Sequence, residues 1–191
     1  MEWILAAVCA MCAIFLGGKP PLHLQGRKKK WYIAATAGIN VWCAFALGSW
    51  PVVSKCAILI LTNLLLMISV TDLSEKMVYD IHFYPLLLVG VLGILMDLAA
   101  LVVRGIVFAL LSAVFFLTTR NKKEIGTGDT RLIASLALYF SFSRWVEVML
   151  IALGAAAVYG VIGIFRKKRT MHSELPFVPF LLAGVLLDIM L

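Results

Sequence analysis

The sequence predicts an all-α fold, a polytopic bundle of transmembrane helices, and its composition carries that prediction. Of the 191 residues, 63% are apolar and only 14% are charged, whereas a soluble domain carries about 25% charged residues. The mean hydropathy is +1.02 over the whole chain, so apolar residues form its bulk. At about 20 apolar residues per crossing, the chain has room for about eight spans. We therefore expect residues 1–191 to form a single integral-membrane domain in a lipid bilayer. A disordered chain, a disulfide scaffold and a nucleic-acid-binding module are excluded.

Eight apolar segments account for the predicted spans. The first lacks a basic region and a small-residue cleavage site, so we expect a retained span and not a signal peptide. Trp31, Trp50 and Trp145 lie at segment ends, where amphipathic rings favour the membrane interface. In chain order the segments are 1–16, 31–50, 52–71, 81–100, 102–119, 129–142, 145–165 and 176–191.

The segment 129–142 is short for a crossing, because about 14 residues rise only ~21 Å. If it crosses, 14 of the 17 lysines and arginines lie in loops on one side, and only Lys55, Arg104 and Arg144 lie on the other. Loops rich in basic residues stay in the cytoplasm. We therefore predict eight spans, one of them short, with both termini outside and four cytoplasmic loops. The net charge of +7 then reflects basic residues in the cytoplasmic loops, which set the orientation of the spans.

Two aspartates lie where this topology makes them functional candidates. Asp72 follows the apolar run of residues 58–70, and Asp129 follows Gly126, Thr127 and Gly128 and begins the next apolar segment. Both are expected at the cytoplasmic boundary, where an ionisable side chain is costly to desolvate. Simpler roles remain open for each, because Asp129 is also suited to be a helix N-cap and Asp72 to be an interfacial residue facing water.

As a pair, the two carboxyl groups suit general acid–base catalysis on a peptide bond. Two carboxyl groups in a partly dry site do not both ionise, so one keeps a proton. The charged group activates a water, and the protonated group donates to the carbonyl oxygen. A helix start stabilises a carboxylate, which favours Asp129 as the ionised member and Asp72 as the protonated one. Gly126 and Gly128 let backbone approach backbone, so we predict that they help to bind an extended peptide substrate.

The residues around these acids resemble a known family. Gly-Thr-Gly-Asp-Thr-Arg at residues 126–131 resembles the Gly-x-Gly-Asp motif of type IV prepilin peptidases and archaeal preflagellin peptidases, which are membrane-embedded aspartic proteases. Asp72 and Leu73 match the place of the family's first catalytic Asp. Pro-Phe-Val-Pro-Phe at residues 176–180 resembles a Pro-Phe-Gly-Pro-Phe stretch of many bacterial members. The resemblance covers residues 52–191 and implies that Asp72 and Asp129 are catalytic.

Some positions depart from the family pattern. Val78 and Tyr79 replace an Ile-Pro pair, Arg131 stands where Lys is common, and Val178 stands where Gly is common. Asp80 is a second acid near Asp72, although Asp72 fits the motif better. These departures indicate a divergent member, and a catalytically inactive relative remains an alternative.

The cysteines argue against a metal site. Many bacterial members carry two Cys-x-x-Cys pairs in a zinc-binding segment that accompanies N-methylation of the cleaved pilin. Here Cys9 and Cys12 form the only such pair, inside an apolar segment without a nearby His, so core packing is the better explanation. The resemblance therefore implies a short peptidase that lacks the methylation segment and needs no metal or cofactor.

The remaining acids fall into two groups by predicted membrane side. Substrates of the resembled family carry a basic leader before a hydrophobic helix, so Glu75, Asp80 and Glu124 are predicted to attract that leader by charge complementarity. An ordinary role as solvated loop acids is the alternative. Asp97, Glu147 and Asp188 are expected near the outer face, facing solvent.

The function that these patterns favour is an intramembrane aspartic endopeptidase of the cell membrane. We expect it to cut the basic leader from a type IV prepilin-like or preflagellin-like membrane protein at the cytoplasmic face. Two alternatives remain: an inactive relative that acts as a membrane assembly component, and a small transporter with acids in its spans. The particular substrate and the oligomeric state are open.

Overall fold

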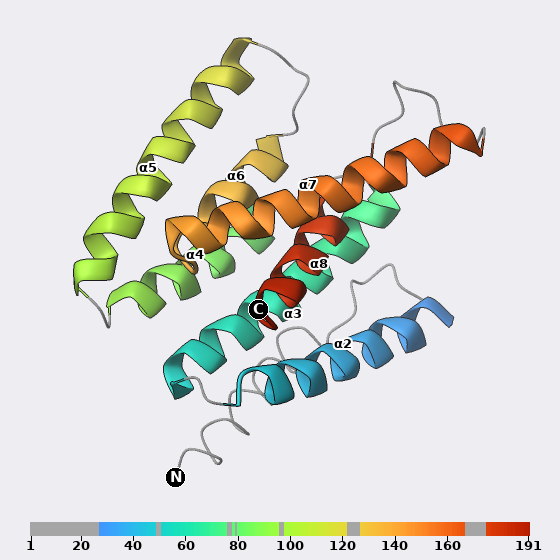
Figure 1. Cartoon of the computed structure of the whole chain (residues 1–191), viewed down its shortest axis with the longest axis horizontal. Helices are drawn as coiled ribbons and strands as arrows, with labels where there is room; N and C mark the ends of the chain where they lie inside the picture. Colours follow the sequence, from blue (N-terminus) through green and yellow to red (C-terminus); the bar gives the residue numbers. More distant parts are fainter. Residues whose placement is uncertain are drawn as a thin grey trace.

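The structure, a computed structural model, is an assembly of packed α-helices (Figure 1). It describes residues 27–48, 51–75, 78, 80–95, 98–121, 127–166 and 175–191. Within these residues there are seven helices and no strand, which confirms the predicted all-α class. The helices are α2 (Arg27–Ala46), α3 (Val52–Glu75), α4 (Asp80–Leu95), α5 (Leu98–Asn121), α6 (Thr127–Leu136), α7 (Phe142–Phe165) and α8 (Val178–Asp188).

The helices follow the predicted apolar segments, with two differences. The predicted segment 81–100 ends early, because α4 stops at Leu95 and α5 begins at Leu98. Helix α6 has ten residues and gives way to turns at residues 137–139, so its helical part rises only ~15 Å. The predicted first span, residues 1–16, lies outside the described residues.

Two helices of the described chain are long and apolar enough to cross a membrane: residues Ser54–Glu75 of α3 and all of α7, Phe142–Phe165. Shorter apolar helices occur at Val102–Val114 and in α8. The count of eight spans is therefore not established by these helices. The two long helices have different surroundings, because 67% of the apolar stretch of α3 is buried but only 17% of that of α7.

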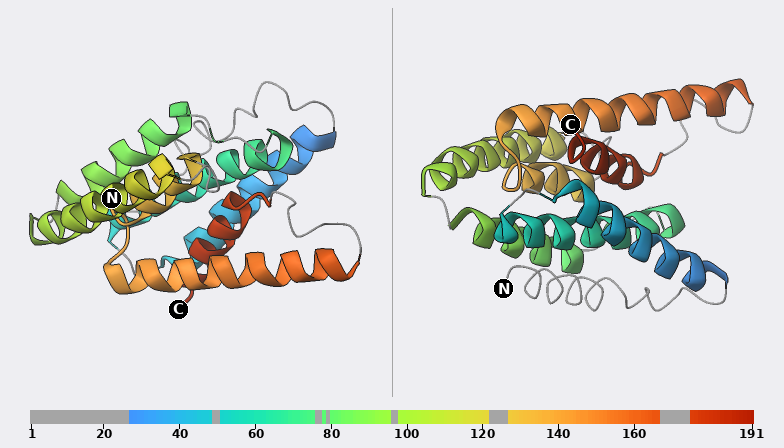
Figure 2. Two further views of the ribbon diagram at one scale, coloured as in Figure 1. Left: turned by 90° about the horizontal axis from the view of Figure 1, so that it is seen from above. Right: turned by 60° about the horizontal axis from the view of Figure 1, so that its bottom comes forward.

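Helix α3 occupies the centre of the bundle. It packs against α2, α4 and α8, and α8 in turn packs against α7. Helix α6 contacts α4 and α5. Figure 2 shows α2 and α7 on opposite sides of the bundle, with α3 between them. This arrangement buries an apolar core that includes Leu61, Leu65 and Ile68 of α3 and Leu181 and Val185 of α8.

Polar contacts fix the helices that surround α3. On one side, Asn63 of α3 donates to the side-chain oxygen of Asn40 of α2 at 2.8 Å. On the other side, the indole nitrogen of Trp145 donates to the carbonyl of Ile133 at 2.9 Å, which ties α7 to α6. The Tyr139 hydroxyl donates to the carbonyl of Leu86 of α4. Since buried polar groups bond fixed partners, these contacts hold α2 against α3, α7 against α6, and the turn after α6 against α4.

Candidate active site

Asp72 lies near the end of α3 and is buried, with 5% of its surface exposed. The backbone N–H of Val178 donates to its Oδ2 atom at 3.1 Å, and the backbone of Phe177 donates to the same carboxylate. The alternative that Asp72 merely faces water at an interface is therefore not supported. Its carboxylate is held at the start of another helix, α8.

The start of α8 has free backbone donors because of its local sequence. Phe177 is the residue before the first turn, and no side chain caps this helix end. Pro179 has no N–H to offer, so the unpaired donors there are supplied by Phe177 and Val178. A helix N-terminus carries partial positive charge and favours an anion. The Asp72 carboxylate therefore fills the place of a missing N-cap on α8.

Asp129 lies in the first turn of α6, outside the two long apolar helices. Because α6 begins at Thr127, Asp129 is inside the helix and is not its N-cap. Burial raises the pKa of the Asp129 carboxyl to about 6, and the nearby charge of Asp72 raises it further in the same direction. The charge of Asp72 therefore acts on Asp129, although the two acids are 57 residues apart in sequence (129 − 72).

The surroundings of both acids bear on which of them holds the shared proton. Asp72 accepts the backbone N–H of Val178 at the start of α8, and a helix N-terminus favours an anion. Asp129 has its raised pKa from burial and from the charge of Asp72. The sequence argument considered only the helix that carries each acid, and the placement of the proton stays a prediction.

Gly128 is required by a close approach of chain segments. A Cβ atom at this position would lie 2.7 Å from the Cβ of Val78, closer than carbon atoms pack. Val78 belongs to the connection after α3, so a glycine at 128 lets α6 lie against the segment that follows Asp72. The neighbour of Gly128 is therefore a side chain, and the expected approach of backbone to backbone at a bound peptide stays a prediction.

Among the other predicted substrate-binding residues, only the side chain of Glu75 is described. Glu75 is exposed at the last residue of α3. Asp80 begins α4, but its side chain is outside the described set, and so are Glu124 and Gly126. The predicted attraction of a basic leader by these acids stays a prediction. Phe177 and Val178 are contributors that the sequence argument missed, and the Pro-Phe-Val-Pro-Phe stretch was the signal that marked their position.

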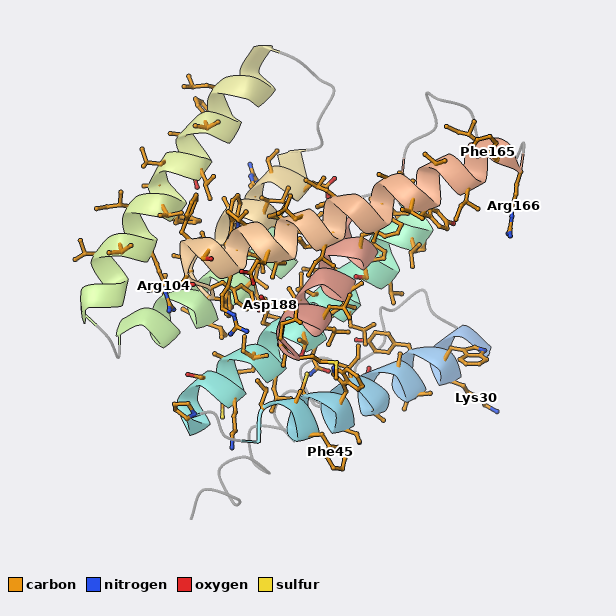
Figure 3. All side chains as sticks on the ribbon, viewed as in Figure 1. Lys30, Phe45, Arg104, Phe165, Arg166 and Asp188 are labelled. Atoms are coloured by element: carbon orange, nitrogen blue, oxygen red, sulfur yellow. The ribbon has the colours of Figure 1, made fainter. Side chains whose placement is uncertain are left out.

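Asp188 corrects an expectation about the outer acids. It was expected to face solvent, but it is fully buried at the end of α8. Its Oδ2 atom lies 3.5 Å from Nε of Arg144, and Nη2 of Arg144 donates to the Asp188 backbone carbonyl at 2.9 Å. Figure 3 labels Asp188 where α8 ends within the bundle. Glu147 is exposed as expected, and Asp97 lies outside the described residues.

Metal-ligating side chains do not gather in the described part of the chain, where no group of three or more His, Cys, Asp or Glu residues is suited to hold an ion. The Cys9–Cys12 pair lies outside that part. Cys43 is buried on α2 and Cys56 is half-buried on α3, and neither forms a disulfide. The prediction that no metal is needed is not tested by these observations.

Comparison with known proteins identifies the family to which this constellation belongs. The model of the type IV leader peptidase family matches residues 58–161, a range that includes Asp72, Gly128 and Asp129. The match covers more than half of the chain, and the chain is a member of the type IV leader peptidase family.

Curated relatives agree with this family. The chain is 32% identical over 127 residues to a prepilin leader peptidase/N-methyltransferase of Burkholderia pseudomallei, covering 63% of the chain and 41% of that protein. It is 28% identical over 130 residues to a protein of the same description from Xanthomonas campestris, covering 64% and 45%. It is 28% identical over 185 residues to one from Pseudomonas aeruginosa, covering 93% and 60%. The chain therefore spans between about two fifths and three fifths of these relatives. No solved structure matches it.

Proposed function

We propose that the protein is an aspartic endopeptidase that removes the basic leader from type IV prepilin-like or preflagellin-like precursors. The observation that carries the proposal is that the start of α8 holds Asp72 and that the charge of Asp72 and burial raise the pKa of Asp129. The family match supports a leader peptidase in general. Asp72 and Asp129 are the proposed catalytic residues.

The chemistry follows from one proton shared by two acids. The Asp72 carboxylate takes a proton from a water, whose oxygen attacks the scissile carbonyl, while Asp129 donates its proton to the carbonyl oxygen. In the second step the resulting diol returns its proton to Asp129, and Asp72 protonates the leaving nitrogen as the C–N bond breaks. Each acid ends as it began, so the pair needs no cofactor.

The proposed setting is a multi-pass protein in the cell membrane with its acids at the cytoplasmic face. The two long apolar helices and the excess of basic residues in one set of loops support this orientation. We retain eight crossings as the proposed topology, with α6 in the short one. The substrate's hydrophobic helix would lie against the bundle so that its leader reaches Asp72 and Asp129 from the cytoplasm, with Gly126, Gly128, Glu75, Asp80 and Glu124 as the proposed substrate contacts.

We also propose that this chain cleaves without N-methylation. Its single Cys-x-x-Cys pair, Cys9 and Cys12, lies in an apolar run, and a tetrahedral zinc site needs four ligands. The test is a mass measurement of the cleaved product, which should carry a free, unmethylated N-terminus. A methylated product formed by the purified protein would contradict this part of the proposal.

Cleavage of a co-expressed prepilin in membranes tests the main proposal. Asp72→Asn and Asp129→Asn should each reduce cleavage at least about a thousandfold, with unchanged membrane insertion and expression. Glu147→Gln is the matched control, because Glu147 is an exposed acid on α7 outside the pair. Full activity in either aspartate variant overturns the proposal.

Restoring the family pattern at residues 78 and 79 distinguishes an impaired peptidase from an inactive relative. If the wild type is inert and Val78→Ile with Tyr79→Pro gains cleavage, the chain is an impaired peptidase. If neither cleaves any prepilin, an assembly role replaces the enzyme proposal. Solute flux in liposomes without proteolysis would favour a transporter.

A further inference from the structure

A polar cavity lies at the end of the bundle away from the acid pair. Its volume is about 180 Å³, and its walls come from α3, α4, α5, the turn before α7, and α7 itself. The wall residues that concern us are Arg104, Arg144, Ser54 and Ser141. Since a water occupies about 30 Å³, the space suits a polyatomic group.

The charge in this cavity is concentrated in two guanidinium groups. Arg104 is half-buried on α5 and donates from Nη1 to the carbonyl of Tyr139 at 3.4 Å, and a neutral carbonyl does not neutralise its charge. Arg144 lines the same cavity and pairs with Asp188 through Nε and Nη2. Figure 3 shows Arg104 on the side of α5 that faces the other helices. The guanidinium of Arg104, with the serine hydroxyls nearby, matches the oxygens of a phosphate group.

A second cavity beside the first is mostly apolar. Its volume is about 310 Å³, and it shares Arg104, Phe140 and Ser141 with the polar cavity. Its other walls include Val103, Val107 and Phe142. Val103 and Phe142 are 61% and 58% exposed, so this cavity opens on the outer surface of the bundle. A polar cavity joined by common residues to an apolar one suits an amphipathic ligand.

The position of the two cavities separates them from the proposed peptidase site. Ser54 and Asp72 both lie on α3, 18 residues apart (72 − 54), which is ~27 Å along the helix. Arg104 and Arg144 are also two of the three basic residues predicted for the outer side of the membrane. Since basic residues are scarce on that side, the meeting of two of them at one cavity points to a role beyond topology.

We propose that these cavities bind an anionic phospholipid. Its phosphate accepts hydrogen bonds from Arg104, and an acyl chain lies against Val103, Val107 and Phe142. This inference rests on the proposed membrane location but not on peptidase activity. The Asp72→Asn variant should therefore bind the lipid as the wild type does, so failure of one proposal is distinguishable from failure of the other.

The test is lipid binding by the purified chain in detergent, measured by native mass spectrometry. The probes are dioleoyl phosphatidylglycerol, dioleoyl phosphatidylcholine and inorganic phosphate. We expect phosphatidylglycerol to bind at least about tenfold more tightly than phosphatidylcholine, and Arg104→Gln to remove about that factor. Lys55→Gln is the matched control, because Lys55 is the third outer basic residue and bonds the carbonyl of Gly48 instead. It should change binding less than twofold.

A second variant tests the apolar cavity independently. Val107→Trp fills that space and should weaken phosphatidylglycerol binding severalfold, while melting temperatures confirm that both variants fold. Equal binding of the two lipids, or no effect of Arg104→Gln, overturns the proposal. Binding of inorganic phosphate that depends on Arg104, without binding of phosphatidylglycerol, overturns it in favour of a free anion.

Discussion

Two buried carboxylates at opposite ends of the bundle differ in what faces them. Asp188 is fully buried, but Arg144 supplies an opposite charge 3.5 Å away. Asp72 is 5% exposed, accepts the backbone N–H of Val178 and interacts with the like charge of Asp129. A carboxylate beside an opposite charge is suited to a structural role, whereas two acids that share one proton are suited to transfer it. Burial alone therefore does not distinguish a structural acid from a reactive one.

The largest expected difference in cleavage is between Asp72→Asn and Asp188→Asn, which make the same substitution at opposite ends of the bundle. Asp72→Asn should lower prepilin cleavage at least about a thousandfold, because an amide cannot accept the proton of the attacking water. Asp188→Asn should leave cleavage within about threefold, because Asp188 serves the Arg144 contact. Initial rates at matched protein levels in membranes provide the measurement. Comparable losses of cleavage in the two variants would break the distinction.

Loss of Arg144 and loss of Asp188 should lower the free energy of unfolding by different amounts, although the two residues form one ion pair. Arg144→Met leaves a fully buried, unpaired carboxylate and should reduce the free energy of unfolding by about 3–5 kcal/mol. Asp188→Asn leaves an arginine that is 32% exposed and should cost less. Chemical denaturation in detergent measures both. The double variant should be more stable than Arg144→Met alone, and a double variant that is less stable would contradict the pairing.

Close packing near Asp129 should make cleavage sensitive to substitution of Gly128. Gly128→Ala places a Cβ 2.7 Å from that of Val78, which displaces the start of α6 and Asp129 with it. We expect a loss of cleavage of about 10- to 100-fold, since small misplacements of catalytic groups are costly. Gly154→Ala, where a Cβ meets nothing within 4 Å, should have no effect. Val78→Gly should rescue Gly128→Ala, and absence of rescue would argue against this contact.

The proton on Asp129 should appear in the pH profile. Its pKa is raised to about 6 by burial and by Asp72, so the protonated form declines as the pH rises through that value. We expect kcat/KM to fall about tenfold per unit above pH 6, and to fall again at low pH when Asp72 takes a proton. A profile that is flat from pH 5.5 to 8 would contradict the assignment of the acid role to Asp129.

The smallest effect is expected at Val178. Its contact with Asp72 uses the backbone N–H, so Val178→Gly keeps the donor and should leave cleavage within about threefold. The loss of a fully buried side chain should lower stability by about 1–3 kcal/mol. Cleavage and thermal unfolding of the same preparation separate the two effects. A large loss of cleavage without unfolding would show that the side chain, and not the N–H, positions Asp72.

The sequence was sufficient to predict the helices that the structure describes, because apolar runs mark helices directly. The charge distribution predicts that Asp72 and Asp129 lie on one side of the membrane, and this stays a prediction. The donors at residues 177 and 178 were not predicted, because a backbone N–H is common to every residue except proline. The burial of Asp188 was not predicted either, because its partner Arg144 is 44 residues away in the chain.

The bond between Val178 and Asp72 joins residues 106 positions apart. During synthesis both aspartates leave the ribosome well before the helix that orients one of them. A nascent chain without α8 would carry the two acids but leave the Asp72 carboxylate without its donors. Under the proposed function, the order of translation therefore delays proteolytic competence until α8 has been made and has docked against α3.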